Sequence, residues 1–352
     1  MPVPKAKPQV EALSPYVAPL EGRRGKLRLD FNEHTVGPSP RVLEAIRGLP
    51  ADAYATYPEY DGLHDDYARH CGVEPGQVQA FNGADAAIRA VFDAFGEQGA
   101  TFLTTAPTFG YYGPCAQQQG MVVRAIEYPA DLSFPLSAIE AALAERPRLL
   151  FICNPNNPTG TLLPPARIAA LARAAPDTLV VVDEIYARFA GVTTLPDATT
   201  LDNLLVLRSL SKTHGLAALR VGFAVGAEAL VQRLSRVIGP YDLNMFAVVA
   251  ARAALADDAH VERYVQEVLA ARQWTLSELE RRGIRHARGE GNYVLVWPGQ
   301  DLQAVVDGLS ERGVLVRSMA GKPVIDGSFR LTIGTETQMR RFFTELDAVR
   351  GT

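Results

Sequence analysis

One lysine in this chain, Lys212, is isolated from the other lysines: it is the only one between Lys26 and Lys322. Of the 35 basic residues only five are lysines, namely Lys5, Lys7, Lys26, Lys212 and Lys322. Arginine supplies the other positive charges and stays protonated, whereas a lysine amine can lose its proton and act as a nucleophile. The isolation of Lys212 therefore suggests a reactive amine, with a solvated surface charge as the ordinary alternative.

The residues around Lys212 suit an anion as well as an imine. The segment Arg208-Ser209-Leu210-Ser211-Lys212-Thr213-His214 directly follows the apolar run Leu204–Leu207, and Arg220 comes shortly afterwards. Serine hydroxyls and an arginine can bind a phosphate while the lysine forms an imine. Taken alone, a plain turn after a strand explains the segment equally well.

Two polar segments follow other apolar runs. Asn154-Pro155-Asn156-Asn157-Pro158-Thr159-Gly160 follows Leu149–Cys153, and Val181-Val182-Asp183-Glu184-Ile185-Tyr186 places the Asp183 carboxylate at the end of a run. Open α/β sheets bind ligands at the carboxyl ends of their strands. A carboxylate there can hold a ring nitrogen protonated, because a negative charge favours a neighbouring cation. The alternatives are a plain turn for the first segment and a helix cap or surface acid for the second.

Two further segments complete this set. Asn82-Gly83-Ala84-Asp85-Ala86 lies where a strand turns into a helix, whose first amides can bind phosphate, although Asn-Gly also marks plain turns. Ala106-Pro107-Thr108-Phe109, with Tyr111 and Tyr112, offers aromatic rings that can stack on a flat ligand or pack in the core. The five segments together supply an amine, an acid, hydrogen-bond donors, a stacking face and a phosphate cradle. Those are the parts of a pyridoxal 5′-phosphate (PLP) site.

Short apolar runs alternate with helical patterns over much of the chain. Strands are expected at residues 78–81, 101–105, 121–127, 149–153, 179–182, 204–207 and 221–225. Helices are expected at residues 40–48 and 62–71, from about residue 84, and at 164–175. This alternation predicts a mostly parallel sheet that helices cover on both faces.

The C-terminal part has a different pattern. From about Asp257 a long helix leads to Gly283, and two strand-like runs, 293–296 and 329–333, flank a helix at 302–312. We therefore expect an α/β protein with an N-terminal arm over residues 1–32 that belongs to the small domain. A large domain is expected over 33–255 and a small α+β domain over 256–352.

Composition argues against several other classes of protein. The net charge of −4 and the lack of a basic stripe disfavour nucleic-acid binding. No apolar run approaches the roughly 18 residues of a membrane span, and the N-terminal residues lack the apolar core of a secretion signal. Three scattered cysteines fit a reduced cytoplasm. The motifs of a zinc protease, a serine hydrolase and a nicotinamide dehydrogenase are missing from the sequence, so no metal site is expected.

From about Pro15 to Leu346 the chain resembles the aspartate-aminotransferase superfamily of PLP fold type I. The segments 154–160, 181–186 and 208–212 carry this resemblance. Within the superfamily, the chain is similar to the histidinol-phosphate aminotransferase subgroup. That similarity depends on Tyr16, Asn32-Glu33, Gly37-Pro38-Ser39-Pro40, Tyr57-Pro58, Gly83-Ala84-Asp85, Val316-Arg317 and Phe329-Arg330-Leu331.

The resemblance implies a role for each matched residue. Lys212 would form the Schiff base with PLP and move the substrate proton, while Asp183 would pair with the pyridinium nitrogen. Phe109 would stack on the ring, and Asn157 and Tyr186 would hold its phenolic oxygen. The cofactor phosphate would contact Gly83, Ala84, Asp85, Ser209, Ser211 and Arg220, together with Tyr57 from the other subunit of a homodimer. The substrate would contact Arg330, Arg317, Tyr16 and Asn157.

The implied reaction is transamination of L-histidinol phosphate with 2-oxoglutarate, which gives imidazole-acetol phosphate and glutamate in histidine biosynthesis. An aromatic amino-acid aminotransferase and a threonine-phosphate decarboxylase are alternatives on the same scaffold, and a cofactor-free binding protein is a third reading. The chain departs from the subgroup at His34, Thr35, Ala86, His214, Gly239 and Asp242. Four of these departures, at residues 34, 35, 239 and 242, lie where the subgroup builds its substrate pocket. They therefore bear on which amino donor is used and not on the cofactor.

Overall fold

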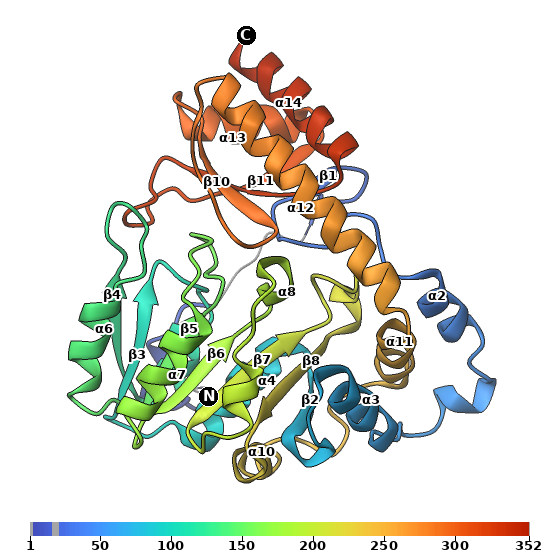
Figure 1. Cartoon of the computed structure of the whole chain (residues 1–352), viewed down its shortest axis with the longest axis vertical. Coiled ribbons are helices and arrows are strands. Elements are labelled where there is room, and N and C mark those ends of the chain that lie inside the picture. Colours follow the sequence, from blue (N-terminus) through green and yellow to red (C-terminus); the bar gives the residue numbers. More distant parts are fainter. Residues whose placement is uncertain (1–2, 16–20, 352) are drawn as a thin grey trace.

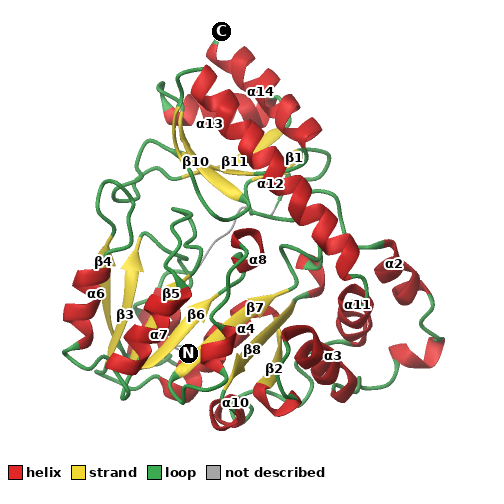
Figure 2. Cartoon of the chain, viewed as in Figure 1, coloured by secondary structure: helices red, strands yellow, loops and turns green. Residues whose placement is uncertain are grey.

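The computed structural model describes residues 3–15 and 21–351 of the chain. Its strands form one seven-stranded and one five-stranded sheet. Figure 1 shows the five-stranded sheet, with α13 (Leu302–Glu311) and α14 (Glu336–Arg350), above the larger sheet. The long helix α12 (Asp258–Arg281) extends from the lower part of the molecule to the upper part. Figure 2 shows helices on both sides of the larger sheet.

The larger sheet has the strand order β2-β8-β7-β6-β5-β3-β4. Its strands are β2 (Val78–Asn82), β3 (Thr101–Ala106), β4 (Val122–Glu127), β5 (Leu149–Cys153), β6 (Leu179–Asp183), β7 (Leu204–Ser209) and β8 (Val221–Gly226). The strands from β4 to β7 run parallel, whereas β8 is antiparallel to both of its neighbours. The predicted mostly parallel sheet is therefore confirmed.

Both faces of this sheet are buried. In β5, Leu150 and Ile152 belong to one apolar cluster, while Leu149 and Phe151 belong to the cluster on the opposite face. The first cluster includes residues of α3 (Asp61–Cys71), α6 (Leu136–Leu143), α7 (Pro165–Ala174) and α11 (Met245–Leu255). The second includes residues of α4 (Gly83–Phe95), α5 (Tyr112–Gln118) and α10 (Glu228–Leu234). The strand is apolar throughout because successive side chains face opposite covered surfaces.

The smaller sheet has the order β1-β11-β12-β10-β9. Its strands are β1 (Leu27–Leu29), β9 (Arg285–Ala287), β10 (Tyr293–Trp297), β11 (Val314–Ser318) and β12 (Phe329–Thr332). The N-terminal β1 lies parallel to β11, with Leu27 opposite Val314. The chain therefore returns to the large sheet through the segment between β1 and α2 (Pro40–Arg47). The domain boundaries at residues 32 and 255 stay predictions.

The described residues also form three short α-helices. They are α1 (Pro8–Glu11), α8 (Ala187–Ala190) and α9 (Leu195–Ala198). Within the described residues, no helix is both long and apolar enough to cross a membrane.

Candidate active site

The carboxyl ends of β5, β6 and β7 lie side by side, because these strands are parallel neighbours. The segments that follow them leave the sheet at one edge, where open α/β sheets bind ligands. A cavity at this edge brings together residues from all five polar segments of the sequence. It is lined by Ala84, Asp85, Phe109, Cys153, Asn157, Asp183, Ile185, Tyr186, Ser209, Ser211, Lys212, Ala217 and Arg220.

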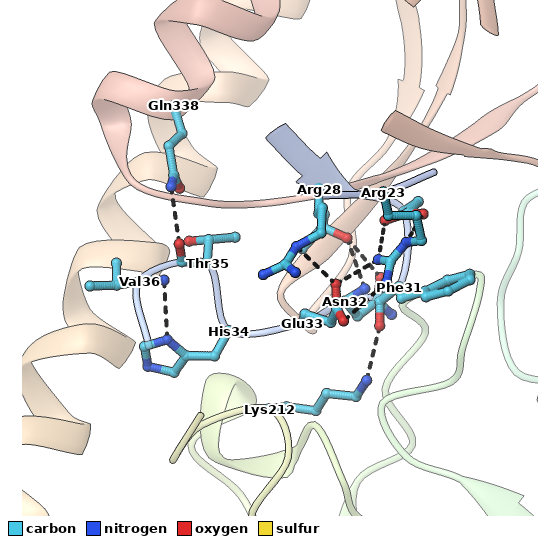
Figure 3. Close-up of polar contacts among 12 residues, drawn as sticks. Arg23, Arg28, Phe31, Asn32, Glu33, His34, Thr35, Val36, Lys212 and Gln338 are labelled. Atoms are coloured by element: carbon cyan, nitrogen blue, oxygen red, sulfur yellow. Dashed lines mark hydrogen bonds and ion pairs between the residues drawn. The ribbon is translucent and has the colours of Figure 1, made fainter. Parts of the chain in front are cut away.

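Lys212 extends from the loop after β7 toward the N-terminal segment. Its Nζ donates a 2.9 Å hydrogen bond to the carbonyl oxygen of Phe31, as Figure 3 shows. Burial, together with the positive charge of Arg330, lowers the pKa of Lys212 to about 8. A fraction of the amine is therefore unprotonated at neutral pH, which a nucleophile or a general base requires.

Asp183 ends β6 and is only 1% exposed. The hydroxyl of Tyr112 donates to its Oδ2 at 2.6 Å, and the backbone amide of Ile185 donates to its Oδ1 at 3.2 Å. Burial raises the pKa of the Asp183 carboxyl and these two hydrogen bonds oppose the rise, which leaves the pKa at about 6. A buried carboxylate favours a cation beside it, which suits a protonated ring nitrogen.

A second group of lining residues suits a phosphate. The hydroxyls of Ser209 and Ser211 lie 2.9 Å apart, and Nη2 of Arg220 donates to Oδ2 of Asp85 at 2.9 Å. The first amides of α4 have no partner within the helix. Gly83 begins that helix with φ +79°, and a Cβ there would lie 2.5 Å from Nη2 of Arg220. Glycine therefore allows the guanidinium to lie against the helix start.

Arg330 lies on β12 of the smaller sheet but reaches the larger one. Its Nη1 donates to Oδ1 of Asn157, and its Nη2 donates to the carbonyl oxygen of Asp30 at 2.7 Å. The side chain is buried, and its Nε has no hydrogen-bond partner among the described residues. A guanidinium with an unused buried N–H beside the cavity suits an oxyanion.

The turn 154–160 is partly structural. Asn154 exchanges hydrogen bonds of 2.9 and 2.8 Å with the backbone of Leu163, and Asn156 donates to the carbonyl oxygen of Pro107 at 3.0 Å. Of the turn residues, Asn157 is the one that lines the cavity. The alternative of a plain turn therefore holds for part of the segment.

Some predicted site residues do not line the cavity. Tyr57 is 71% exposed, and its ring stacks on that of Tyr241 at 3.8 Å between centroids. Arg317 lies opposite Arg330 in the smaller sheet, and its guanidinium is 5.7 Å from the ring centroid of Phe31. Tyr16 is outside the described residues. The roles of these residues stay predictions.

Two residues that contact the predicted set were not predicted to do so. Tyr112 was expected only as a possible stacking ring, yet its hydroxyl binds Asp183. Asn32 was noted only for the resemblance, and its Nδ2 donates to the hydroxyl of Tyr186 at 3.0 Å. Asn32 and Tyr186 are 154 positions apart, so no local spacing signals their contact.

Comparison with known proteins defines the class. Residues 24–346 match the family model for class I and II aminotransferases, and the chain belongs to this family. The predicted aminotransferase class and its cofactor, PLP, are thereby confirmed. The substrates of this class are an amino donor and a keto acid.

The similar proteins carry a more particular name. The chain is 32% identical to histidinol-phosphate aminotransferase of Moorella thermoacetica, across 98% of this chain and 92% of that protein. It is 35% identical to histidinol-phosphate aminotransferase 2 of Thiobacillus denitrificans, across 97% and 96%. The crystal structure of histidinol-phosphate aminotransferase from Sinorhizobium meliloti in complex with PLP superimposes with a TM-score of 0.90 at 26% identity. That superposition covers 99% of this chain and 98% of the other.

The residues of the cavity fit PLP. The Lys212 amine has a lowered pKa, as attachment of an aldehyde requires. The buried Asp183 carboxyl suits the ring nitrogen, and Ser209, Ser211 and Arg220 offer donors to the phosphate.

Proposed function

We propose that the protein transfers the amino group of L-histidinol phosphate to 2-oxoglutarate, which yields imidazole-acetol phosphate and glutamate in histidine biosynthesis. The observation that carries this proposal is that the Lys212 amine and the buried Asp183 carboxyl line one cavity. A reactive amine and a buried acid in one cavity are the two groups that PLP-dependent transamination requires. The choice of donor is supported by relatives of that name, which align with nearly the whole chain.

Each catalytic step is assigned to a side chain of this cavity. Bound PLP withdraws electrons from the α-carbon of the substrate, so that the proton on this carbon becomes acidic. The Lys212 amine would attach the cofactor in the resting enzyme and, when free of it, would move a proton at Nζ from the α-carbon of the substrate to the C4′ carbon of the cofactor. Asp183 keeps the ring nitrogen protonated. Phe109 stacks on the ring, while Asn157 and Tyr186 hold the phenolic oxygen.

Two anion sites complete the proposal. The cofactor phosphate is held by Gly83, Ala84, Asp85, Ser209, Ser211 and Arg220. Arg330 binds the phosphate of the donor and the carboxylate of the acceptor in turn, because the first product leaves before the acceptor enters. The buried Nε of Arg330 supports this role, because it has no hydrogen-bond partner in the described part of the chain and so offers one further N–H to an oxyanion. Arg317 and Tyr16 contribute to the same substrate site.

The enzyme is further proposed to be a cytoplasmic homodimer, in which Tyr57 contacts the cofactor phosphate of the partner subunit. Tyr57, Tyr54 and Tyr241 are all largely exposed, and such a group of aromatic side chains is typical of a protein interface. All three cysteines are free thiols, which fits a reduced compartment.

The absorption spectrum of the purified enzyme tests the function. Adding L-histidinol phosphate alone should move the visible band of the lysine-bound cofactor to the shorter wavelength of the aminated cofactor, and 2-oxoglutarate should restore the band. Phenylalanine, tyrosine and threonine phosphate serve as competing donors in the same assay. A visible band that histidinol phosphate leaves unchanged would refute the proposed donor but not the cofactor.

A further inference from the structure

Asn32 occupies a constrained position beside the active site. It lies in the segment between β1 and α2, is fully buried, and has φ +54°. Residues with a Cβ adopt this left-handed conformation at an energetic cost, which is smallest for asparagine and aspartate. A strained backbone at a buried residue requires compensating contacts from its surroundings.

Asn32 forms hydrogen bonds with three residues that are far from it in the sequence. Its backbone amide donates to Oγ1 of Thr332 at 3.0 Å, and its carbonyl oxygen accepts from Nδ2 of Asn292 at 3.2 Å. The Thr332 hydroxyl donates to Oδ1 of Asn32 at 3.2 Å. Because this hydroxyl occupies the oxygen of the side-chain amide, the amide nitrogen faces Tyr186 and donates to its hydroxyl at 3.0 Å.

Arg23 contacts side chains on both sides of Asn32. Its guanidinium donates to the two carboxylate oxygens of Asp30 at 2.7 and 3.0 Å, and to Oε2 of Glu33 at 2.6 Å. The same guanidinium lies 4.1 Å from the ring centroid of Phe31. Figure 3 shows this arrangement, with Lys212 below the segment and bonded to the Phe31 carbonyl. The segment that carries Asn32 is therefore fixed over the reactive lysine.

The phenol of Tyr186 depends on this contact. Tyr186 is buried, and burial raises the pKa of its hydroxyl, whereas the nearby Arg330 and the hydrogen bond from Asn32 lower it. With one lone pair of the oxygen engaged by Asn32, the hydroxyl proton can point into the cavity that Tyr186 lines. A hydroxyl that accepts a hydrogen bond is also a stronger donor, because the two bonds polarise each other.

We propose that Asn32 is a positioning residue of the active site that acts through Tyr186. Its side-chain amide fixes the phenol and strengthens it as a donor to the phenolic oxygen of the cofactor. This inference rests on the proposed function, in which Tyr186 holds that oxygen. Thr332 orients the amide, and Arg23 keeps the segment in place.

The test is a pH titration of the visible band in the cofactor-loaded enzyme without substrate. The wild type is compared with Asn32→Gly, Tyr186→Phe and the double variant. Glycine tolerates the left-handed backbone but removes the amide, so the fold is kept as far as possible. Asn32→Asp is a second variant that keeps the shape of the side chain and removes the donor. Asn292→Ala is the matched control, because it removes a buried hydrogen bond to Asn32 but has none to Tyr186.

Asn32→Gly should raise the midpoint of the titration by about half a pH unit, since one hydrogen bond that stabilises the deprotonated form is weakened. Asn32→Asp should shift it in the same direction, and Asn292→Ala should leave it unchanged. In the Tyr186→Phe background the increment from Asn32→Gly should vanish, because the residues act as a pair.

The inference about Asn32 would be overturned if neither Asn32 variant shifted the midpoint of the titration. It would also be overturned if Asn32→Gly shifted the midpoint equally in the wild type and in Tyr186→Phe. Either result would leave the proposed function standing. A wild-type protein that shows no visible band at all would overturn the proposed function and this inference together. Failure to accept histidinol phosphate would affect only the proposed donor, since no substrate is present in the titration.

Discussion

The hydroxyl of Tyr112 donates a 2.6 Å hydrogen bond to Oδ2 of Asp183, and both side chains are almost fully buried. Burial raises the pKa of this carboxyl, and the hydrogen bond from Tyr112 limits the rise to about 6, so it helps to keep Asp183 ionised at neutral pH. A protonated Asp183 would no longer favour a cation at the ring nitrogen. The tyrosine therefore extends to lower pH the range in which this carboxyl is ionised.

The first prediction concerns this pair. Tyr112→Phe should raise the pKa of Asp183 above about 6, because the ionised form loses a donor. The acidic limb of the kcat/KM profile should then move upward by about one pH unit. Tyr67→Phe, which changes another buried tyrosine that stacks on Phe223, should leave the limb in place. Identical pH profiles for Tyr112→Phe and the wild type would contradict the role given to Tyr112.

A second prediction tests the reactive amine. Lys212→Ala and Lys212→Arg should both lose the visible band of the bound cofactor, and turnover should fall by a factor on the order of 10³ or more. Arginine keeps the positive charge but is not deprotonated, so charge alone should not rescue the enzyme. Spectroscopy and single-turnover assays measure both effects. A normal band in Lys212→Arg would place the attachment elsewhere.

The third prediction is a pH dependence of stability in the cofactor-free protein. The pKa of Lys212 is lowered from 10.5 to about 8 on folding, so the unfolded chain binds more protons between these pH values. The free energy of unfolding should therefore rise as the pH increases from about 8 to 10.5. Below about pH 8 the folded protein carries the full destabilisation that comes from burying the charged amine.

Lys212→Met removes this titration. At pH 7 the variant should be more stable than the wild type by an amount on the order of 2 kcal/mol, reduced from the full shift because the amine is partly accessible. The difference should shrink toward pH 10.5, as urea unfolding of both proteins at several pH values would show. A constant difference at every pH would exclude Lys212 as its source.

A fourth prediction addresses the anion site at Arg330. Arg330→Lys should lower kcat/KM for 2-oxoglutarate about 100-fold. The planar guanidinium of arginine can bind Asn157, the Asp30 carbonyl and a substrate oxyanion at the same time, whereas a lysine ammonium cannot. The visible band should persist, since the lysine attachment is unchanged. Arg312→Lys, which alters an ion pair with Glu345 on the surface, is the matched control. Equal kinetics for both variants would argue against substrate binding by Arg330.

The fifth prediction concerns the proposed homodimer. Lys212→Ala and Tyr57→Ala subunits should each be weakly active alone, and mixed dimers should recover activity. In a mixed dimer, the subunit that keeps Lys212 receives Tyr57 from the other chain. Coexpression with two affinity tags isolates these mixed dimers for assay. If mixing restores nothing, Tyr57 does not contribute to the site of the other subunit.

Much of the architecture could be predicted from local patterns. Strands buried on both faces must be apolar throughout, and the polar residues that follow them must lie at the sheet edge, so segments such as 149–160 and 179–186 were readily recognised. Short or half-exposed strands were missed, among them β9 and β11. An apolar run also does not reveal its direction, which is why the antiparallel placement of β8 needed the structure.

Local sequence patterns are enough to identify the chemical groups of the site, namely the Lys212 amine, the Asp183 carboxylate and the hydroxyls of Ser209 and Ser211. Their order after apolar runs also determined the edge at which they meet. The contacts between these and other side chains, such as Tyr112 with Asp183 and Asn32 with Tyr186, are visible only in the folded chain. These contacts join residues far apart in the chain. They depend on how helices and the smaller sheet pack against the strands, and no local spacing encodes that packing.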